Sequence, residues 1–365
     1  MTVEWSRMAM RLEKIGFNAW FQDRLNKENI PDMQPARVAA VNRNSYLVTD
    51  GSRTITAELT GKMLFNAESP LDYPAVGDWV YVQVFDSDSL ALIHEIFPRR
   101  TLLKRKVAGK RVDIQLIAAN IDTAIIIQSL DSDFNLRRLE RYLVMINESE
   151  AVPVVLMSKS DLTTPEEVAK KVAEIHGLMP DIKVIAINCV SENGLDMVKD
   201  ELTPGKTFCL MGTSGVGKTT LINSLLKAEV YETQAVRESD GSGRHTTTRR
   251  QLVFLENGAM IIDTPGMREL GNVSEDEGLV DTFVEIVELA AQCRYNDCSH
   301  LGEDGCAVQA ALVEGTLAAD RFENYLKLKK ESEYNARSYR ESRERDRKFG
   351  KYCKSVMKDK KKERP

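Results

Sequence analysis

Apolar positions change their spacing along the chain, and these changes divide it into four parts. In residues 1–36 apolar side chains recur at helical spacing and predict a helical extension packed on the body, with Trp5, Met8, Leu12 and Ile15 as its apolar face. Residues 37–108 instead hold short β-rich runs broken by turns, namely 36–41, 45–49, 54–59, 78–84 and 90–96. Five such strands predict a small closed all-β barrel, for which the oligonucleotide-binding (OB) fold is the commonest candidate.

In residues 109–284 strands and helices alternate. Near-continuous apolar runs predict parallel strands buried on both faces, at 123–128, 153–157, 183–187, 207–211 and 259–262. Helical spacing between them appears in 136–146, 165–176 and 220–226. The alternation predicts a doubly wound α/β domain whose ligand lies at the carboxyl ends of the strands. Residues 285–365 become helical and contain cysteines before a basic tail.

The run that follows strand 207–211 has the pattern of a phosphate-binding P-loop. It lies between a strand and a helix, which is the context that the G-x-x-x-x-G-K-[ST] pattern requires. Glycines let backbone N–H groups close around phosphate oxygens, and the start of the helix adds its positive end. Lys218 is expected to contact the β- and γ-phosphates, and the Thr219 hydroxyl to contact Mg²⁺. The predicted nucleotide-binding residues here are Gly212, Thr213, Ser214, Gly215, Val216, Gly217, Lys218, Thr219 and Thr220.

Asp263-Thr264-Pro265-Gly266 stands at the end of a later apolar strand. We expect Asp263 to hold Mg²⁺ through water and the Gly266 N–H to sense the γ-phosphate. Between the P-loop and this motif, residues 239–250 are rich in glycine and threonine, and we expect a first switch loop there. Thr246 is the candidate that meets the metal ion and the γ-phosphate, with Thr247 as the alternative.

Hydrolysis requires a water molecule aligned with the γ-phosphate. Met267, which follows Gly266, cannot orient water as a glutamine does. His245 is the best candidate within the chain, because a neutral imidazole can accept a proton from water; a contact with RNA or a solvated position is the alternative. The predicted catalytic residues are therefore His245, Lys218 and Thr246.

A guanine-binding motif of the Asn-Lys-x-Asp type appears before the P-loop rather than after it. Ser158-Lys159-Ser160-Asp161 follows strand 153–157, so that Asp161 would accept hydrogen bonds from guanine and the Lys159 stem would lie along the base. Asn188-Cys189-Val190 stands where a second base loop is expected. Because strand ends converge in either chain order, this arrangement predicts a circularly permuted GTPase.

Cys293, Cys298, His300 and Cys306 lie within 14 residues. Three thiols and one imidazole complete a tetrahedral zinc site with no position left for water, which predicts one structural Zn²⁺. The other three cysteines have no such neighbours. Six cysteines in a chain of 365 residues are too few for a disulfide scaffold, and their use favours a reducing cytoplasm.

The net charge of −5 hides a strong asymmetry. Residues 321–365 hold 17 Lys and Arg against 8 Asp and Glu, a surplus of nine positive charges. A basic tail on an acidic body indicates a polyanionic partner. The basic residues that follow the barrel could also track a phosphate backbone, and they include Arg99, Arg100, Lys104, Arg105, Lys106, Lys110 and Arg111. We find no 18-residue apolar run and no leader segment, so no membrane partner is expected.

The barrel, the P-loop, Gly243 to Thr248, the Asp263 motif and the zinc pattern together resemble the ribosome-small-subunit-dependent GTPases, the RsgA or YjeQ family, over about residues 37–355. The resemblance implies GTP hydrolysis stimulated by the small ribosomal subunit and its rRNA during late 30S maturation, with GTP or GDP and Mg²⁺ bound to a chain expected to be a monomer. The sequence departs from the family pattern at Ser158, where Asn is usual; loss of that amide predicts weaker nucleotide binding. An RNA-binding assembly factor with GTP only as a switch, and a metabolic P-loop kinase, are the alternative functions.

Overall fold

One sheet of the structure passes through both the predicted barrel and the predicted α/β domain. The structure, a computed structural model, describes residues 3–25, 33–85, 90–107, 113–131, 133–189, 194–227, 250–264 and 277–362. The chain falls into two compact units, of which the first is Met1–Lys104 with Leu116–Leu270 and the second is Arg105–Gln115 with Gly271–Pro365. The first unit contains the eleven-stranded sheet found in the described part of the chain.

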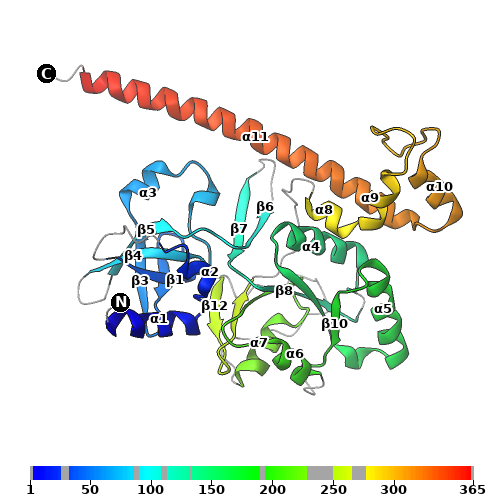
Figure 1. The fold of residues 1–365 in the computed structure, drawn as a ribbon, viewed down its shortest axis with the longest axis horizontal. Coiled ribbons are helices and arrows are strands. Elements are labelled where there is room, and N and C mark those ends of the chain that lie inside the picture. The colour runs from blue at the N-terminus through cyan, green and yellow to red at the C-terminus, as the bar shows by residue number, and fades with distance from the viewer. Residues whose placement is uncertain are drawn as a thin grey trace, which may run out of the picture. The chain divides into compact units, whose positions relative to one another are not determined.

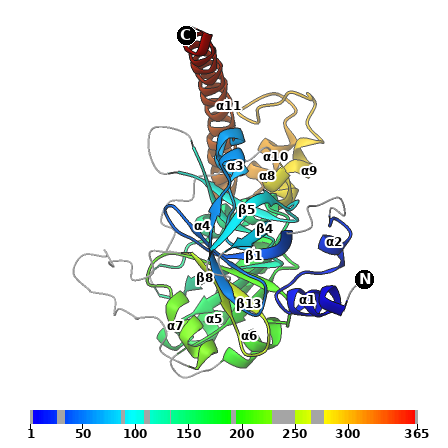
Figure 2. The ribbon, with the colours of Figure 1, turned by 90° about the vertical axis from the view of Figure 1, so that its left-hand side faces the viewer.

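Five strands close the barrel, and they agree with the five predicted runs. They are β1 (Met33–Val41), β2 (Tyr46–Thr49), β3 (Thr54–Leu59), β4 (Trp79–Phe85) and β5 (Leu90–Ile96). The order β1-β2-β3-β5-β4 closes through a β1–β4 pairing, with β3 and β5 parallel and the other pairs antiparallel. Alternate residues fill the interior, as Ile55 and Ala57 do on β3. Helix α3 (Gly61–Asn66), which is labelled in Figure 2, follows β3 along the chain. The five closed strands confirm the prediction of an OB-like barrel.

Strand β1 begins at Met33, three residues before the predicted start. Pro35 lies inside it, opposite Tyr81 of β4. Residues 33–36 pair only with β4, because pairing with β2 begins at Arg37. The missing N–H of Pro35 is therefore tolerated at a position where the strand has one neighbour. Before β1, the helical extension contains α1 (Val3–Lys14) and α2 (Ala19–Gln22).

The α/β domain has five parallel strands in the order β10-β9-β8-β11-β13. They are β8 (Thr123–Ser129), β9 (Val152–Ser158), β10 (Lys183–Ala186), β11 (Thr207–Met211) and β13 (Met260–Asp263). Strand β12 (Gln251–Phe254) is antiparallel to β13 and joins the barrel through the pairing of Gln251 with Ala40 of β1.

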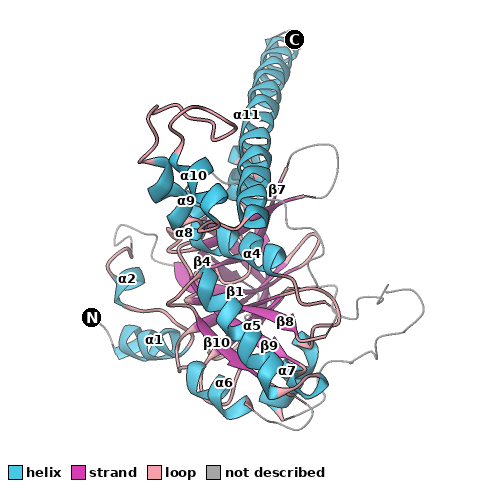
Figure 3. Cartoon of the chain, turned by 90° about the vertical axis from the view of Figure 1, so that its right-hand side faces the viewer, coloured by secondary structure: helices cyan, strands magenta, loops and turns pink. Residues whose placement is uncertain are grey.

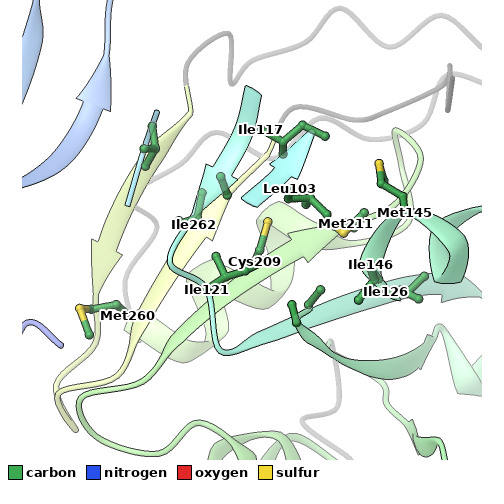
Figure 4. Close-up of a cluster of buried hydrophobic side chains, with 14 of the residues drawn as sticks. Leu103, Ile117, Ile121, Ile126, Met145, Ile146, Cys209, Met211, Met260 and Ile262 are labelled. Carbon is green, nitrogen blue, oxygen red and sulfur yellow. The ribbon is translucent and has the colours of Figure 1, made fainter. Parts of the chain in front are cut away.

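Both faces of this sheet are buried under helices, as the apolar strands predicted (Figure 1). On β8, Ile126 packs in the cluster that contains residues of α4 (Leu136–Glu148) and α5 (Pro165–Leu178). Its neighbours Ile125 and Ile127 pack in the opposite cluster with α6 (Leu195–Glu201) and α7 (Lys218–Leu226). Figure 4 shows Ile126 with Ile146 of α4 in the first cluster.

Arg37 of β1 joins the barrel to the α/β domain. Its side chain is 1% exposed and donates to Ile15 O at 2.6 Å, to Gly77 O at 3.3 Å and to Asn120 O at 3.2 Å. It also donates to Thr207 Oγ1 of β11 at 2.8 Å. Burial lowers the pKa of Arg37 to about 10, although nearby Asp122 opposes this shift. One guanidinium thus holds the N-terminal extension, the barrel and a strand that leads into the P-loop.

The basic segment after the barrel differs from the prediction. Arg99 binds the buried carboxylate of Asp78 at 2.8 Å, and Arg100 binds Asp122 at 2.6 Å. These two side chains therefore stabilise the fold instead of tracking a phosphate backbone. The segment also forms a two-stranded sheet of β6 (Leu102–Lys106) and β7 (Ile114–Ala119), which was not predicted.

The second unit is mainly helical (Figure 3). It contains α8 (Glu277–Thr282), α9 (Val284–Ala290), α10 (Ala307–Glu314) and the long α11 (Ala319–Lys362), which carries the basic tail. Phe283 and Tyr325 meet edge to face at 5.4 Å between ring centroids, and the Arg321 guanidinium lies over the Phe283 ring while pairing with Glu285. This packing fixes the start of α11 against α8 and α9.

Candidate functional site: a nucleotide site and a metal centre

The P-loop adopts backbone conformations that only glycine takes easily. Gly212 has a φ of +150°, and a Cβ at this position would lie 2.6 Å from Ile127 O of β8. Gly217, with a φ of +101°, stands immediately before α7. The strand therefore turns sharply into the helix, and the helix start faces the site.

Lys218 and Asp263 place opposite charges in this buried site. Lys218 Nζ donates to Gly212 O at 2.8 Å and to Thr213 O at 2.7 Å. Burial lowers the pKa of Lys218 to about 8, opposed by Asp263, and burial raises the pKa of Asp263 to about 6, opposed by Lys218. Asp263 ends β13, which pairs with β11, and Thr219 follows Lys218 directly. An ammonium and a carboxylate thus lie close enough for each to shift the pKa of the other, and the hydroxyl-bearing Thr219 is the next residue of α7.

The predicted base loop lies against the P-loop. Ser158, the last residue of β9, is buried and donates its hydroxyl to Val216 O at 2.6 Å. Ser160 N donates to Ile187 O at 3.2 Å, which ties the loop to the segment after β10. Lys159 has a φ of +58°, and Asp161 is exposed. The contact between base loop and P-loop is therefore made by a serine hydroxyl, at a position where the sequence pattern predicted only the loss of an amide.

The second predicted base loop contacts the helix that follows the P-loop. Asn188 is buried, and Cys189 O accepts from Ser224 Oγ of α7 at 3.5 Å. The segments that follow β9, β10, β11 and β13 thus come together at one end of the sheet, in the permuted order that the sequence predicts. His245, Thr246, Thr247 and Gly266 lie outside the described residues, as do Val190 and the other switch residues of 239–249 and 265–266.

Two acidic residues of the site were not predicted. Asp131 and Asp133 follow β8, and Asp131 Oδ2 accepts from Lys159 Nζ at 2.8 Å. Asp133 Oδ2 accepts from Thr213 Oγ1 at 2.8 Å. The available signal was their place in the chain, because polar residues directly after a buried parallel strand lie at the ligand-binding end of the sheet.

In the second unit the four predicted metal ligands lie together. Their ligand atoms are within 4.8 Å of one another, with Cys293 Sγ 3.6 Å and Cys306 Sγ 3.5 Å from His300 Nδ1, and the two sulfur atoms 3.8 Å apart. Zn–S bonds of about 2.3 Å and Zn–N bonds of about 2.0 Å place tetrahedral ligand atoms about 3.5–3.8 Å apart. The spacing of Cys293, Cys306 and His300 therefore fits one zinc ion, with the Cys298 sulfur within 4.8 Å as the fourth candidate ligand.

The backbone around this cluster is shaped to hold it. The Glu303 carboxylate accepts from Ser299 N at 2.8 Å and from Leu301 N at 2.9 Å, which closes the turn that carries His300. Cys306 caps α10, and its sulfur accepts from Gln309 N at 3.4 Å. A helix N-terminus directed at this sulfur stabilises a thiolate ligand.

Comparisons with known proteins agree with this geometry. A sequence model of the family described as RsgA GTPase matches residues 96–273. The "Small ribosomal subunit biogenesis GTPase RsgA 2" of Lactiplantibacillus plantarum is 42% identical over 334 residues, which cover 92% of this chain and 93% of that protein.

No helix within the described ranges is both long and apolar enough to cross a membrane.

Two solved structures share the fold. The crystal structure of YjeQ from Thermotoga maritima covers 82% of this chain and 98% of its own, with a TM-score of 0.59 and 24% identity. The structure of YloQ, described as a circularly permuted GTPase, covers 84% of this chain and 98% of its own, with a TM-score of 0.57 and 22% identity. The predicted architecture of a barrel, a permuted α/β domain and a helical cysteine-bearing module is therefore confirmed, and the chain belongs to the RsgA family of GTPases.

Proposed function

We propose that this chain hydrolyses GTP in a reaction that the small ribosomal subunit stimulates, during late maturation of that subunit. The observation that carries the proposal is the hydrogen bond from Ser158 to Val216 O, because it joins a guanine-type base loop to a P-loop in the permuted order. The relatives named small ribosomal subunit biogenesis GTPases, which align over most of the chain, support the choice of partner.

In this proposal Lys218 and the amides of Gly212 to Thr220 bind the phosphates, while Thr219 and Asp263 hold Mg²⁺. The metal ion neutralises charge on the β- and γ-phosphate oxygens when it is bound. Lys218 must leave Gly212 O and Thr213 O to reach a phosphate, and the phosphate charge then replaces those two acceptors. Asp161 reads the guanine edge, and the Lys159 stem covers a face of the base, within a base loop of Ser158, Lys159, Ser160 and Asp161.

For the switch segments the proposal rests on sequence. Gly266 senses the γ-phosphate, Thr246 contacts the metal ion, and His245 orients the attacking water. Because no glutamine follows Gly266, we expect slow hydrolysis by the free protein and faster hydrolysis when the subunit orders these segments.

The flanking modules bind the partner. We propose that Cys293, Cys298, His300 and Cys306 hold one structural Zn²⁺ and that the barrel and the basic α11 contact rRNA. The proposed domains are a helical extension at 1–36, the barrel at 37–108, the permuted GTPase domain at 109–284 and the zinc-binding module with its basic tail at 285–365. The chain acts as a monomer in the cytoplasm, where ribosomal subunits mature.

The test is multiple-turnover phosphate release from GTP, titrated with small subunits, large subunits or neither. We expect stimulation by small subunits alone. Lys218→Ala should abolish turnover, whereas Lys227→Ala, which changes an exposed lysine at the other end of α7, should not. Binding to the subunit without any stimulated turnover would instead support an RNA-binding factor that uses GTP as a switch, and equal stimulation by large subunits would contradict the proposed partner.

A further inference from the structure

The segment between β8 and α4 is closed by its own hydrogen bonds. Gln128 Nε2 donates to Asn135 O at 3.3 Å, and Asn135 N donates back to Gln128 Oε1 at 3.0 Å. Asn135 Oδ1 accepts from Arg138 N at 2.9 Å and caps α4. Leu130 N donates to Ser158 O at 2.9 Å. These contacts anchor Leu130 and Asn135, on either side of the two aspartates, before any nucleotide binds.

Asp131 uses this fixed position to hold the base-loop lysine. Its carboxylate accepts from Lys159 Nζ at 2.8 Å, from Ser129 Oγ at 2.6 Å and from Asp133 N at 2.9 Å. Burial opposes ionisation, but the hydrogen bonds from Lys159 and Ser129 outweigh it and lower the pKa of Asp131 to about 2. The carboxylate is therefore charged near neutral pH.

Asp133 holds the P-loop in the same way. Its carboxylate accepts from Thr213 Oγ1 at 2.8 Å and pairs with Arg138, with a closest distance of 2.9 Å. Thr213 is also the residue whose carbonyl receives Lys218 Nζ. One short segment therefore contacts the side chains of both loops.

We propose that Asp131 and Asp133 are positioning residues for guanine-nucleotide binding, Asp131 by holding the Lys159 stem extended and Asp133 by holding Thr213 of the P-loop. The inference rests on the proposed guanine site. A lysine stem loses much rotamer freedom when it is fixed against a base. With Nζ already bound to Asp131, this loss is incurred on folding and not on binding, so the nucleotide binds more tightly. Neither carboxylate needs to touch the nucleotide.

The experiment is a double-mutant cycle on the full chain, read by equilibrium titration with a fluorescent GDP analogue. We expect Asp131→Ala to weaken binding by about five- to tenfold. Asp131→Ala should add nothing when Lys159 is already alanine, because the stem that it positions is then absent. Equal effects of Asp131→Ala with and without Lys159, or a change below about twofold, would overturn the role of Asp131.

Thr213→Val and Asp133→Ala form the second double-mutant cycle. Asp133→Ala should weaken binding of the GDP analogue in the wild type but add nothing when residue 213 is already valine, and equal effects in both backgrounds would overturn the role of Asp133. Asp196→Ala is the matched control, since it removes a carboxylate from an exposed ion pair with Lys199 on α6. Asp131→Asn keeps the size of the side chain but removes the charge that Lys159 and Ser129 stabilise; it should weaken binding in the same direction while lowering the thermal midpoint less than Asp131→Ala does. If it binds like the wild type, the charge has no positioning role.

Inosine diphosphate separates positioning of the stem from readout of the base edge. It lacks the 2-amino group that Asp161 recognises but offers the same ring face to Lys159. Asp131→Ala should therefore weaken GDP and inosine diphosphate by the same factor. A selective loss of GDP binding would show that the variant acts through Asp161 and would overturn the inference. Failure of the wild-type protein to bind GDP would instead overturn the proposed function itself.

Discussion

Replacing Ser158 by alanine removes the contact that joins the base loop to the P-loop. The side chain is 2% exposed, and its hydroxyl lies 2.6 Å from Val216 O and 3.4 Å from Gln128 O. A buried carbonyl that loses its donor costs about 1–3 kcal/mol. If about 1–2 kcal/mol of this is the cost of bringing the two loops together around a nucleotide, Kd for GDP should rise by about 5- to 30-fold.

The assay is a GDP titration together with thermal unfolding in the absence of nucleotide. Ser149→Ala is the matched control, because Ser149 is also buried and its hydroxyl donates to Ile146 O at 2.7 Å, at the end of α4. Both variants should lose stability, but only Ser158→Ala should lose affinity. An unchanged Kd for Ser158→Ala, or an equal rise in Kd for Ser149→Ala, would refute the reasoning.

Three other changes have defined outcomes. Folding raises the pKa of Asp263 from 3.8 to about 6 and lowers that of Lys218 from 10.5 to about 8, so the nucleotide-free protein should lose stability as pH rises from 3.8 to 6 and regain it from 8 to 10.5. In Asp263→Asn the dependence of the thermal midpoint on pH should flatten on the acid side. The same pH profile in this variant and the wild type would contradict the raised pKa of Asp263. Cys306→Ser should abolish stoichiometric zinc, measured by elemental analysis, and make the second unit protease-sensitive while GDP affinity is retained; full zinc content would refute the ligand set. Arg37→Met should cost about 2–4 kcal/mol in urea unfolding because several buried acceptors lose their donor, whereas the exposed Arg24→Met should cost under about 1 kcal/mol; equal losses would argue against a joining role for Arg37.

Local patterns were sufficient for most of the fold. The runs at 54–59 and 90–96 are strands with the predicted bounds, because alternation of apolar and polar residues within a few positions determines which face is buried. The P-loop prediction follows from local spacing and its strand-to-helix context, because its glycines, lysine and hydroxyl stand within eight consecutive residues.

Contacts between distant residues could not be predicted in this way. Arg99 and Arg100 look like a phosphate-binding pair, but their carboxylate partners lie 21 and 22 residues away. Arg37 binds groups 22 to 223 residues away along the chain. From the sequence, Ser158 could be interpreted only as the loss of an amide, because the carbonyl to which its hydroxyl donates, Val216 O, is 58 residues away in the chain. Only the folded sheet brings such groups together, so no local pattern indicates them.

The most direct test of the permuted guanine site is a change of base specificity. Xanthine carries a carbonyl where guanine has its 2-amino group, so an amide at residue 161 can donate to xanthine but leaves guanine unpaired. Subunit-stimulated phosphate release by Asp161→Asn should therefore switch from GTP to xanthosine triphosphate. Continued preference for GTP by this variant would contradict a guanine site built from a base loop that precedes its P-loop.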